Sequence, residues 1–363
     1  YNGFVMQLGI SKSVSKKQKE SALIMRKQTK LVAVLSTAAL LAIGASMTSF
    51  AATGWAEEDG TWVYYNRDGE RATEQWKKSG NNWYWLNSDG EMAIDELIQD
   101  GDNYYYVDIN GVMAANQWVA IDNEDAGQDD EPDHYWYYFQ ANGKALKNGD
   151  NSKVALKTVN GKKYAFDDEG RMLFGWVSAD NAERIDNTDG DGFKEGDYYF
   201  GGEDDGAMTV GWLQMDITYD EATSDYEIAP VFNDDEDQTR WFYFKSNGKK
   251  VKAENGDTQK SKTINGKKYE FDQYGAMTAE WSLDVDTAST SGLRGDNATA
   301  THSVSAQYAK QWRYFQDVEN GARVSKGWFK VVSAEYLNYD KYNDDEDAWY
   351  YACLLYTSPS PRD

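Results

Sequence analysis

The stretch NNWYWLNSDG (81–90) places three aromatic residues and a leucine between polar residues. Successive side chains of a β-strand point to opposite faces, so Trp83 and Trp85 share one face. Tyr84 and Leu86 share the other. The residues that follow favour a turn, because asparagine, aspartate and glycine accept the backbone angles that turns require. The stretch therefore predicts one strand of a β-hairpin with aromatic residues on both of its faces.

The same unit recurs along the chain. A unit-start residue returns every 21 residues, at Trp55, Trp76, Leu97 and Trp118. Within each unit a strand aromatic follows seven residues later, and a turn glycine seven residues after that. Self-similarity at a fixed period is the signature of repeat architectures, and Asp-Gly or Asn-Gly marks tight hairpin turns. We therefore predict compact repeats of strand, turn and strand over residues 53–118.

Longer repeats with acidic insertions are predicted for residues 119–351. Residues 136–172 align without a gap to residues 241–277, and eighteen of the 37 aligned positions are identical. A short hairpin buries its apolar face only by stacking on its neighbours. The predicted fold class is accordingly all-β, a β-solenoid of stacked β-hairpin repeats.

The two faces of the predicted strand differ in chemistry. When the strand residues are numbered one to four from the first aromatic, positions two and four are apolar or aromatic in seven copies, as in Tyr84 and Leu86. This constancy predicts a core. Positions one and three hold paired aromatic residues in some copies but Lys163 and Ala165 in another. We interpret this second face as a ligand face that only some repeats use.

This arrangement resembles the choline-binding, or cell-wall-binding, repeats of Gram-positive surface proteins. The matching residues are Gly54-Trp55, Trp62 to Tyr65, Trp83 to Leu86 and Gly90 to Met92. The resemblance implies hairpins wound into a β-solenoid, with aromatic residues of neighbouring repeats and a methionine around the choline of teichoic acid. Leu97 departs from the pattern, because a tryptophan is expected there. The units that contain NGKKY look more like the carbohydrate-contacting repeats of clostridial toxins and glucan-binding enzymes.

The chemistry of a quaternary ammonium agrees with such a face. The group donates no hydrogen bond, so a protein holds it against aromatic rings, each contributing roughly 0.5–2 kcal/mol by cation–π attraction. The candidate ligand-binding residues are unit-start tryptophans, aromatic residues at positions one and three, and methionines after turn glycines. They are Trp55, Trp62, Tyr64, Trp76, Trp83, Trp85, Met92, Tyr104, Tyr106, Met113, Trp118, Trp136, Tyr138, Trp241 and Tyr243.

The predicted function is a non-catalytic cell-wall-binding module that anchors an exported protein through choline-type head groups of teichoic acid. One alternative is a glycan-binding solenoid, in which the same rings stack on sugars. A second is the targeting part of a wall hydrolase whose catalytic domain is missing, and a third is a structural spacer. The two histidines, His134 and His302, lie in insertions without a nucleophile motif. No enzyme activity and no cofactor are predicted.

The charge of the chain excludes some partners. Lysine and arginine number 37 against 61 aspartates and glutamates, a net charge of −24. This balance argues against nucleic acid and against anionic membrane surfaces. The segment NTDGDGFKEGDY (187–198) resembles a calcium-binding EF-hand loop, but Tyr198 stands where that loop needs a bidentate glutamate. We predict no metal site and interpret the acidic runs 234–237 and 344–347 as solvated loops, with weak calcium binding as the alternative.

The two ends of the chain differ in character from the repeats. Residues 25–51 combine a basic start, an apolar stretch and small residues before Ala51, which predicts a secretory signal peptide and no membrane insertion after its removal. The expected location is therefore secreted and cell-wall associated. Residues 1–24 are interpreted as a translated upstream leader. Residues 352–363 resemble a translated sequencing adapter, so we expect a chain truncated near Tyr351, with Cys353 as an artefact.

Overall fold

The computed structural model describes most of the predicted repeat region. The described residues are 53–128, 130–149, 153–217, 238–255, 257, 259–283, 312–332, 347–352 and 357–359. The predicted leader, the predicted signal peptide and Cys353 lie outside them. The chain divides into two compact units, each of which is described by itself: Tyr1–Val119 with Tyr137–Leu146, and Ala120–Trp136 with Lys147–Asp363.

The described residues form β-strands and one short helix, α3 (Gly192–Glu195), which confirms the predicted all-β class. The strands are β1 (Gly54–Glu58), β2 (Thr61–Tyr65), β3 (Gln75–Ser79), β4 (Asn82–Leu86), β5 (Glu96–Asp100), β6 (Asn103–Val107), β7 (Gln117–Asp122), β8 (His134–Phe139), β9 (Lys157–Val159), β10 (Lys162–Tyr164), β11 (Trp176–Val177), β12 (Tyr198–Tyr199), β13 (Gly211–Ile217), β14 (Gln238–Phe244), β15 (Lys260–Ile264), β16 (Lys267–Phe271), β17 (Trp281–Leu283), β18 (Trp312–Tyr314), β19 (Gly327–Val332), β20 (Asp347–Ala352) and β21 (Thr357–Pro359).

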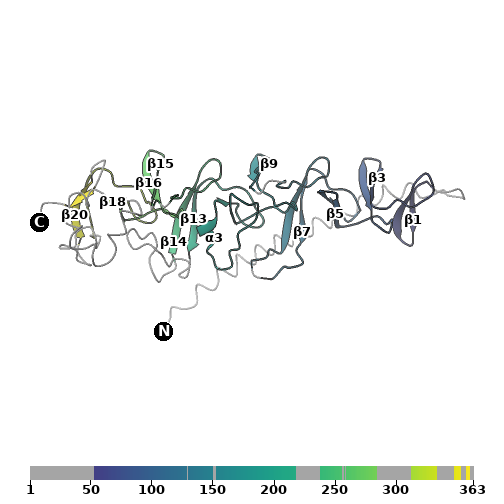
Figure 1. Ribbon diagram of the computed structural model, residues 1–363, viewed down its shortest axis with the longest axis horizontal. Coiled ribbons are helices and arrows are strands. Elements are labelled where there is room, and N and C mark those ends of the chain that lie inside the picture. Colours follow the sequence, from purple (N-terminus) through teal and green to yellow (C-terminus); the bar gives the residue numbers. More distant parts are fainter. Residues whose placement is uncertain are drawn as a thin grey trace, which may run out of the picture. The chain divides into compact units, whose positions relative to one another are not determined.

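Consecutive strands pair into separate two-stranded sheets, from β1-β2 to β17-β18, and β19, β20 and β21 form a three-stranded sheet (Figure 1). The pairs are antiparallel hairpins. The turn within a compact hairpin lies before the first strand aromatic, as at Asp59-Gly60, whereas the predicted turn glycines Gly69, Gly90 and Gly111 lie in the turn after the hairpin. An isolated two-stranded hairpin is marginally stable in water, so each hairpin depends on its neighbours.

The turn that follows each hairpin is fixed by its first residue. The Asn87 side-chain oxygen Oδ1 accepts hydrogen bonds from the backbone N–H groups of Asp89 at 3.0 Å and Glu91 at 2.9 Å. The Gly90 N–H donates to the Asn87 carbonyl at 3.0 Å, with a φ of 76° that favours glycine. The same pair of side-chain bonds is made by Asp108, Asp167 and Asp272.

Backbone hydrogen bonds then join each hairpin to the preceding one. After the turn, the Met92 N–H donates to the Trp62 carbonyl of the preceding hairpin at 2.8 Å, and the Ala93 N–H donates to the Trp85 carbonyl of its own hairpin at 2.9 Å. The Met113 N–H repeats the first bond to Trp83 at 2.9 Å. These bonds hold successive hairpins of one unit side by side.

The methionine of this segment packs beneath the turn glycine of the next repeat. A Cβ atom added to Gly111 would lie 2.9 Å from Met92 Cε, so the close approach requires glycine. The same contact recurs where glycines lie over methionines further along: Gly143 over Met113, Gly206 over Met172, Gly248 over Met208 and Gly321 over Met277.

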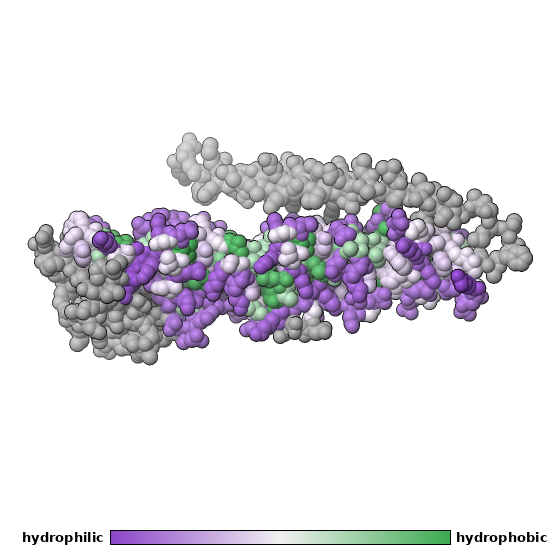
Figure 2. All heavy atoms as spheres, turned by 90° about the horizontal axis from the view of Figure 1, so that it is seen from above, coloured by the Kyte–Doolittle hydropathy of each residue, from purple (hydrophilic) through white to green (hydrophobic). Residues whose placement is uncertain are grey.

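Position four is buried from Leu86 onward, as predicted for a core, whereas position two is buried at Tyr84 and Phe242 but half-buried at Tyr105 and Tyr269. Leu86, Phe139, Phe166 and Phe271 are fully buried at position four. Position three is divided: Trp85 is buried, whereas Tyr64 and Tyr243 are half-buried. On the face seen in Figure 2 the described residues are mainly hydrophilic, with hydrophobic residues in limited patches. In the part of the chain that the structure describes, no helix is long and apolar enough to span a membrane.

Candidate functional site: rings between successive hairpins

The aromatic residues meet between successive hairpins, and we call each such group a ring site. Trp76 lies directly opposite Trp85 in the β3-β4 register, so both rings share one face of the hairpin. Their centroids are 5.2 Å apart, and Tyr105 of the next hairpin lies 5.0 Å from Trp76. A ring site therefore combines a unit-start tryptophan, position three of its own hairpin and position two of the next.

This geometry recurs in both units. Trp55 lies 5.4 Å from Tyr64 of its own hairpin and 5.3 Å from Tyr84 of the next. In the second unit Trp281 lies 5.0 Å from Tyr314 and 4.7 Å from Tyr350. The interplanar angles of these four contacts, 67° to 82°, are edge-on arrangements, which aromatic rings prefer over face-to-face stacking.

The Trp212 ring site brings together four half-buried rings: Trp212, Trp241, Tyr243 and Tyr269. Centroid distances from Trp212 are 6.3 Å to Trp241, 5.0 Å to Tyr243 and 4.9 Å to Tyr269. Here the position-one ring, Trp241, takes part as well. The sequence prediction included Trp241 and Tyr243 but not Trp212 or Tyr269. Trp212 stands at a unit start, like Trp55 and Trp76, and Tyr269 stands at position two, which the sequence pattern assigns to the core.

Carboxylates of later turns bind the edges of several indoles. Trp241 Nε1 donates to Glu319 Oε2 at 3.0 Å, and Gln214 Nε2 donates to both Glu319 oxygens at 3.2 Å. Trp136 Nε1 donates to Asp204 Oδ1 at 3.1 Å, and His134 Nε2 lies 3.0 Å from the same oxygen. These bonds place a negative charge at the edge of an aromatic group.

In the compact unit that contains Trp76, the carboxylate that binds the indole is closer in the sequence. Trp76 Nε1 donates to Asp100 Oδ2 at 3.2 Å. Burial, and secondarily the charge of Asp100, raises the pKa of Tyr105. Sequence reasoning missed Asp100, Asp204 and Glu319, because acidic residues are too frequent in this chain for spacing to mark them.

The other predicted site residues fall into three groups. Trp62, Tyr104 and Trp136 are half-buried at position one, and Trp83 is 40% exposed with Lys78 Nζ 5.7 Å from its ring. Trp118 and Tyr138 lie 5.1 Å apart, and Tyr106 lies 6.1 Å from Phe139 opposite Leu97 in register. Leu97 leaves its interface without an indole. Met92 and Met113 lie beneath turn glycines, as described above.

The EF-hand-like segment has a packing role. Asn187 Oδ1 accepts a hydrogen bond from the Gly192 N–H at 2.9 Å, and the loop leads into α3 with Phe193 buried. Within the described ranges no three histidine, cysteine, aspartate or glutamate side chains are grouped so that they could hold a metal ion. The acidic run 234–237 lies outside those ranges, as does most of 344–347.

Comparisons with known proteins identify the repeat. Residues 72–118 match the family model of the choline-binding repeat. No curated protein matches the chain. The choline-binding domain of Spr1274 from Streptococcus pneumoniae is 33% identical over 26% of this chain and 95% of its own, with a TM-score of 0.20.

Two longer solved structures are also similar, both from Streptococcus pneumoniae. The modular autolysin LytC, solved in complex with a synthetic peptidoglycan ligand, is 18% identical over 84% of this chain, with a TM-score of 0.43. The alignment covers 46% of the autolysin, so the chain spans about half of its length. Choline binding protein F is 17% identical over 86% of this chain and 94% of its own, with a TM-score of 0.38.

Proposed function

The chain belongs to the family of choline-binding repeat proteins, and from this premise we propose that it is a non-catalytic cell-wall-binding module whose ring sites hold quaternary ammonium head groups. The ligand is the choline of teichoic acid, and the protein is exported and wall-associated. Within each unit the hairpins form a β-solenoid. The backbone bonds between hairpins and the glycine–methionine contacts support this stacking.

The Trp212 ring site carries the proposal. It offers several half-buried rings and, at the edge of Trp241, the carboxylate of Glu319. A quaternary ammonium is attracted by ring faces and by a negative charge without donating a hydrogen bond. A sugar hydroxyl would have to donate to Glu319, whose oxygens already accept hydrogen bonds from Gln214 and Trp241. Three rings supply a few kcal/mol, which corresponds to a dissociation constant on the order of millimolar.

Weak single sites suffice for anchoring when several act together. Ring sites with an indole recur at Trp55, Trp76, Trp212 and Trp281. A polymer with many choline groups meets each further site at a high effective concentration, so its overall affinity exceeds that of any one site by orders of magnitude. The same anchoring role would serve a wall hydrolase as its targeting part, and it requires no reaction by the repeats.

The test is a tryptophan-fluorescence titration of the full chain with choline and with 3,3-dimethylbutan-1-ol, its neutral isostere. We expect a saturating response to choline in the millimolar range and none to the isostere. A response to wall oligosaccharides alone would make the chain a glycan-binding protein. If no ligand changes the fluorescence, the result would favour a structural spacer.

A matched pair of variants assigns the response to the Trp212 ring site. Glu319→Gln keeps the side-chain volume and a hydrogen-bond acceptor for Trp241 but removes the charge. We expect it to weaken choline binding at this site by roughly three- to tenfold, about 1 kcal/mol, with no change in melting temperature. Glu254→Gln, an exposed glutamate outside the ring sites, is the control. If both variants bind choline with equal affinity, Glu319 does not contribute to choline binding at this site.

A further inference from the structure

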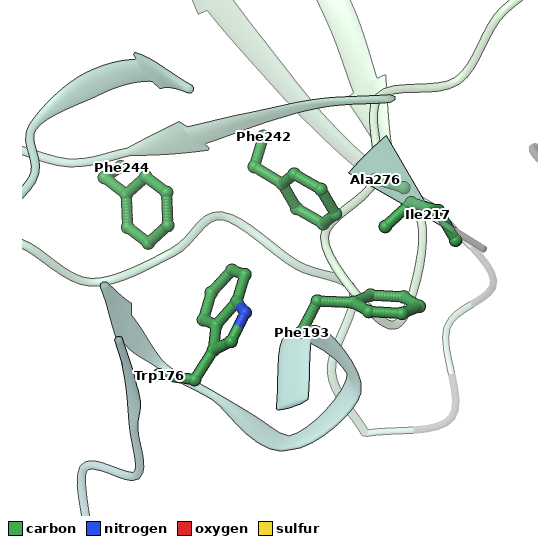
Figure 3. Packing of buried hydrophobic residues seen from close by; sticks show 6 residues of the cluster. All are labelled: Trp176, Phe193, Ile217, Phe242, Phe244 and Ala276. Atoms are coloured by element: carbon green, nitrogen blue, oxygen red, sulfur yellow. The ribbon is translucent and has the colours of Figure 1, made fainter. Parts of the chain in front are cut away.

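One ring site differs from the rest in being closed. Trp176 begins the β11-β12 hairpin, and its ring centroid lies 5.0 Å from Tyr199, 5.8 Å from Phe242 and 6.0 Å from Phe244. Figure 3 shows its indole surrounded by Phe193, Phe242 and Phe244. This Trp176 ring site has the ring arrangement of the Trp212 ring site, but Trp176 is only 2% exposed.

The two ring sites differ in the residue that lies two positions after the turn glycine of the next hairpin. At the Trp212 ring site it is Met277, which belongs to the same buried cluster and lies beneath Gly321. At the Trp176 ring site the equivalent residue is Lys250. Its N–H donates to the Asp197 carbonyl of the preceding hairpin at 2.7 Å, and its side chain passes beneath Gly275. A lysine therefore follows the path that methionine follows in the other repeats.

The lysine ends inside the aromatic group. Its Nζ lies 4.8 Å from the Trp176 ring centroid and 5.8 Å from that of Phe242, within the range of cation–π attraction. Nζ also donates a hydrogen bond to the Phe193 carbonyl. A surface lysine buries its stem and keeps its ammonium in water. Lys250 is 4% exposed, so its ammonium stays within the protein.

The segment 187–196 completes the enclosure. It carries Phe193 to within 5.9 Å of the Phe242 centroid. A Cβ atom added to Gly192 or Gly196 would lie 2.9 Å or 2.5 Å from the Trp176 ring, so the loop backbone lies directly on the indole. Burial, and then the charge of Lys252, lowers the pKa of this amine, whereas the charges of Asp272 and Asp197 raise it.

We propose that Lys250, on the path that Met277 follows at the Trp212 ring site, carries its amine among the rings of the Trp176 ring site as an intrachain occupant, so that this interface is closed to external ligand. The position of the Lys250 amine among these rings does not depend on the proposed function. The conclusion that it excludes a ligand rests on that function. The buried side chain at the position after the turn then decides whether this interface binds an external ligand.

Chemical rescue of Lys250→Ala tests the occupancy in the full chain. The variant retains Cβ, so n-propylammonium supplies the atoms that are removed, and n-propanol is the neutral control. We expect a lower melting temperature than in the wild type, with propylammonium restoring part of the loss and propanol restoring none. Equal shifts by the two compounds, or an equal shift of the wild type by propylammonium, would overturn the proposal.

Lys250→Met is the matched variant, because methionine stands at this position in other repeats. It fills the same path without a charge, so its melting temperature should not respond to propylammonium. A response as large as that of Lys250→Ala would place the bound amine elsewhere and overturn the proposal. If Lys250→Ala does not fold, Lys250→Met decides alone through the pH dependence of stability, which should lose the component due to the buried amine. An unchanged profile would refute the occupancy.

Choline stoichiometry separates this proposal from the proposed function. Equilibrium dialysis should find more choline bound to Lys250→Ala than to the wild type, because the ring site has been opened. Propylammonium rescue with no choline bound to either protein would support the occupancy and refute choline as the ligand. Rescue with the same stoichiometry in both proteins would show that enclosure by Phe193, and not Lys250, closes the interface, which overturns the second half of the proposal.

Discussion

The Trp212 and Trp176 ring sites have the same ring framework and opposite chemistry. Both place a unit-start tryptophan against its own hairpin and the next. The first is half-buried, has Met277 in its cluster and carries the carboxylate of Glu319 at its edge. The second is buried and contains the amine of Lys250. The repeat framework therefore sets the position of the rings, while the residue after the turn and the carboxylate at the ring edge differ between the two sites.

The largest effects on stability and on choline binding are expected from Trp176→Ala and Trp212→Ala. Removing the fully enclosed Trp176 leaves a cavity and should cost about 3–5 kcal/mol of unfolding free energy. Removing half-buried Trp212 should cost less but abolish choline binding at its ring site. Urea denaturation and fluorescence titration of both variants check the two effects. A larger loss of choline binding in Trp176→Ala would reverse the assignment of the open and closed sites.

The next largest effect is expected in the pH dependence of stability, to which only the Trp176 ring site contributes a buried amine. Burial lowers the pKa of Lys250 to about 7 from its usual 10.5. Between these values the unfolded chain binds more protons than the folded one, so stability rises with pH from about 7 to 10.5. The amine contributes a few kcal/mol to this rise. Urea midpoints from pH 6 to 10 for the wild type, with Lys250→Met as the reference, measure it. Parallel profiles would contradict the burial of the amine.

A substitution at a turn glycine probes the contact on which the hairpins of one unit stack. Gly111→Ala places a Cβ atom 2.9 Å from Met92 Cε at a φ of 74°, so we expect a loss of about 1–3 kcal/mol. The double variant with Met92→Ala should recover the steric part of that loss, which a double-mutant cycle by thermal unfolding detects. Gly80→Ala, with nothing within 4 Å of its added Cβ, is the control for backbone strain alone.

The smallest effect is expected from Leu97→Trp, which introduces an indole at the interface that has none. Leu97 lies opposite Tyr106, where a tryptophan would complete the ring arrangement of Trp55 and Trp76. We expect one additional weak choline site per chain and a change in stability of less than about 1.5 kcal/mol. Equilibrium dialysis gives the stoichiometry. If the stoichiometry does not change, choline binding at this interface is limited by the ring at position one or by the edge carboxylate, and not by the unit-start indole.

Hairpins and core positions could be predicted from the sequence because they depend on local signals. The period of 21 residues and the Asn-Gly and Asp-Gly turns fix strand and turn, and burial at Leu86 or Phe271 follows from side-chain alternation. The burial of Trp85 could not be predicted in this way, because it depends on packing against the next hairpin.

Contacts between distant repeats were beyond the sequence pattern. Glu319 is 78 residues from Trp241, and Lys250 is 57 residues from Phe193, with insertions of unequal length between them. The EF-hand-like pattern of 187–198 predicts a role for its acidic residues, whereas the structural role belongs to Phe193 and to the backbone at Gly192 and Gly196, which lies on the Trp176 ring. Spacing predicts the framework of this molecule, but it does not identify the side chains that fill it.

The methionines beneath the turn glycines also determine how this molecule responds to oxidants. Conversion of a thioether to a sulfoxide adds a polar oxygen. A Cβ atom added to Gly143 would already lie 2.4 Å from Met113 Sδ, and one added to Gly321 would lie 2.3 Å from Met277 Sδ, so this oxygen has no room there. Peroxide should therefore loosen the stacking first at the half-buried Met92, Met113 and Met208 and later at the buried Met172 and Met277. The interface that contains Lys250 in place of methionine would be spared.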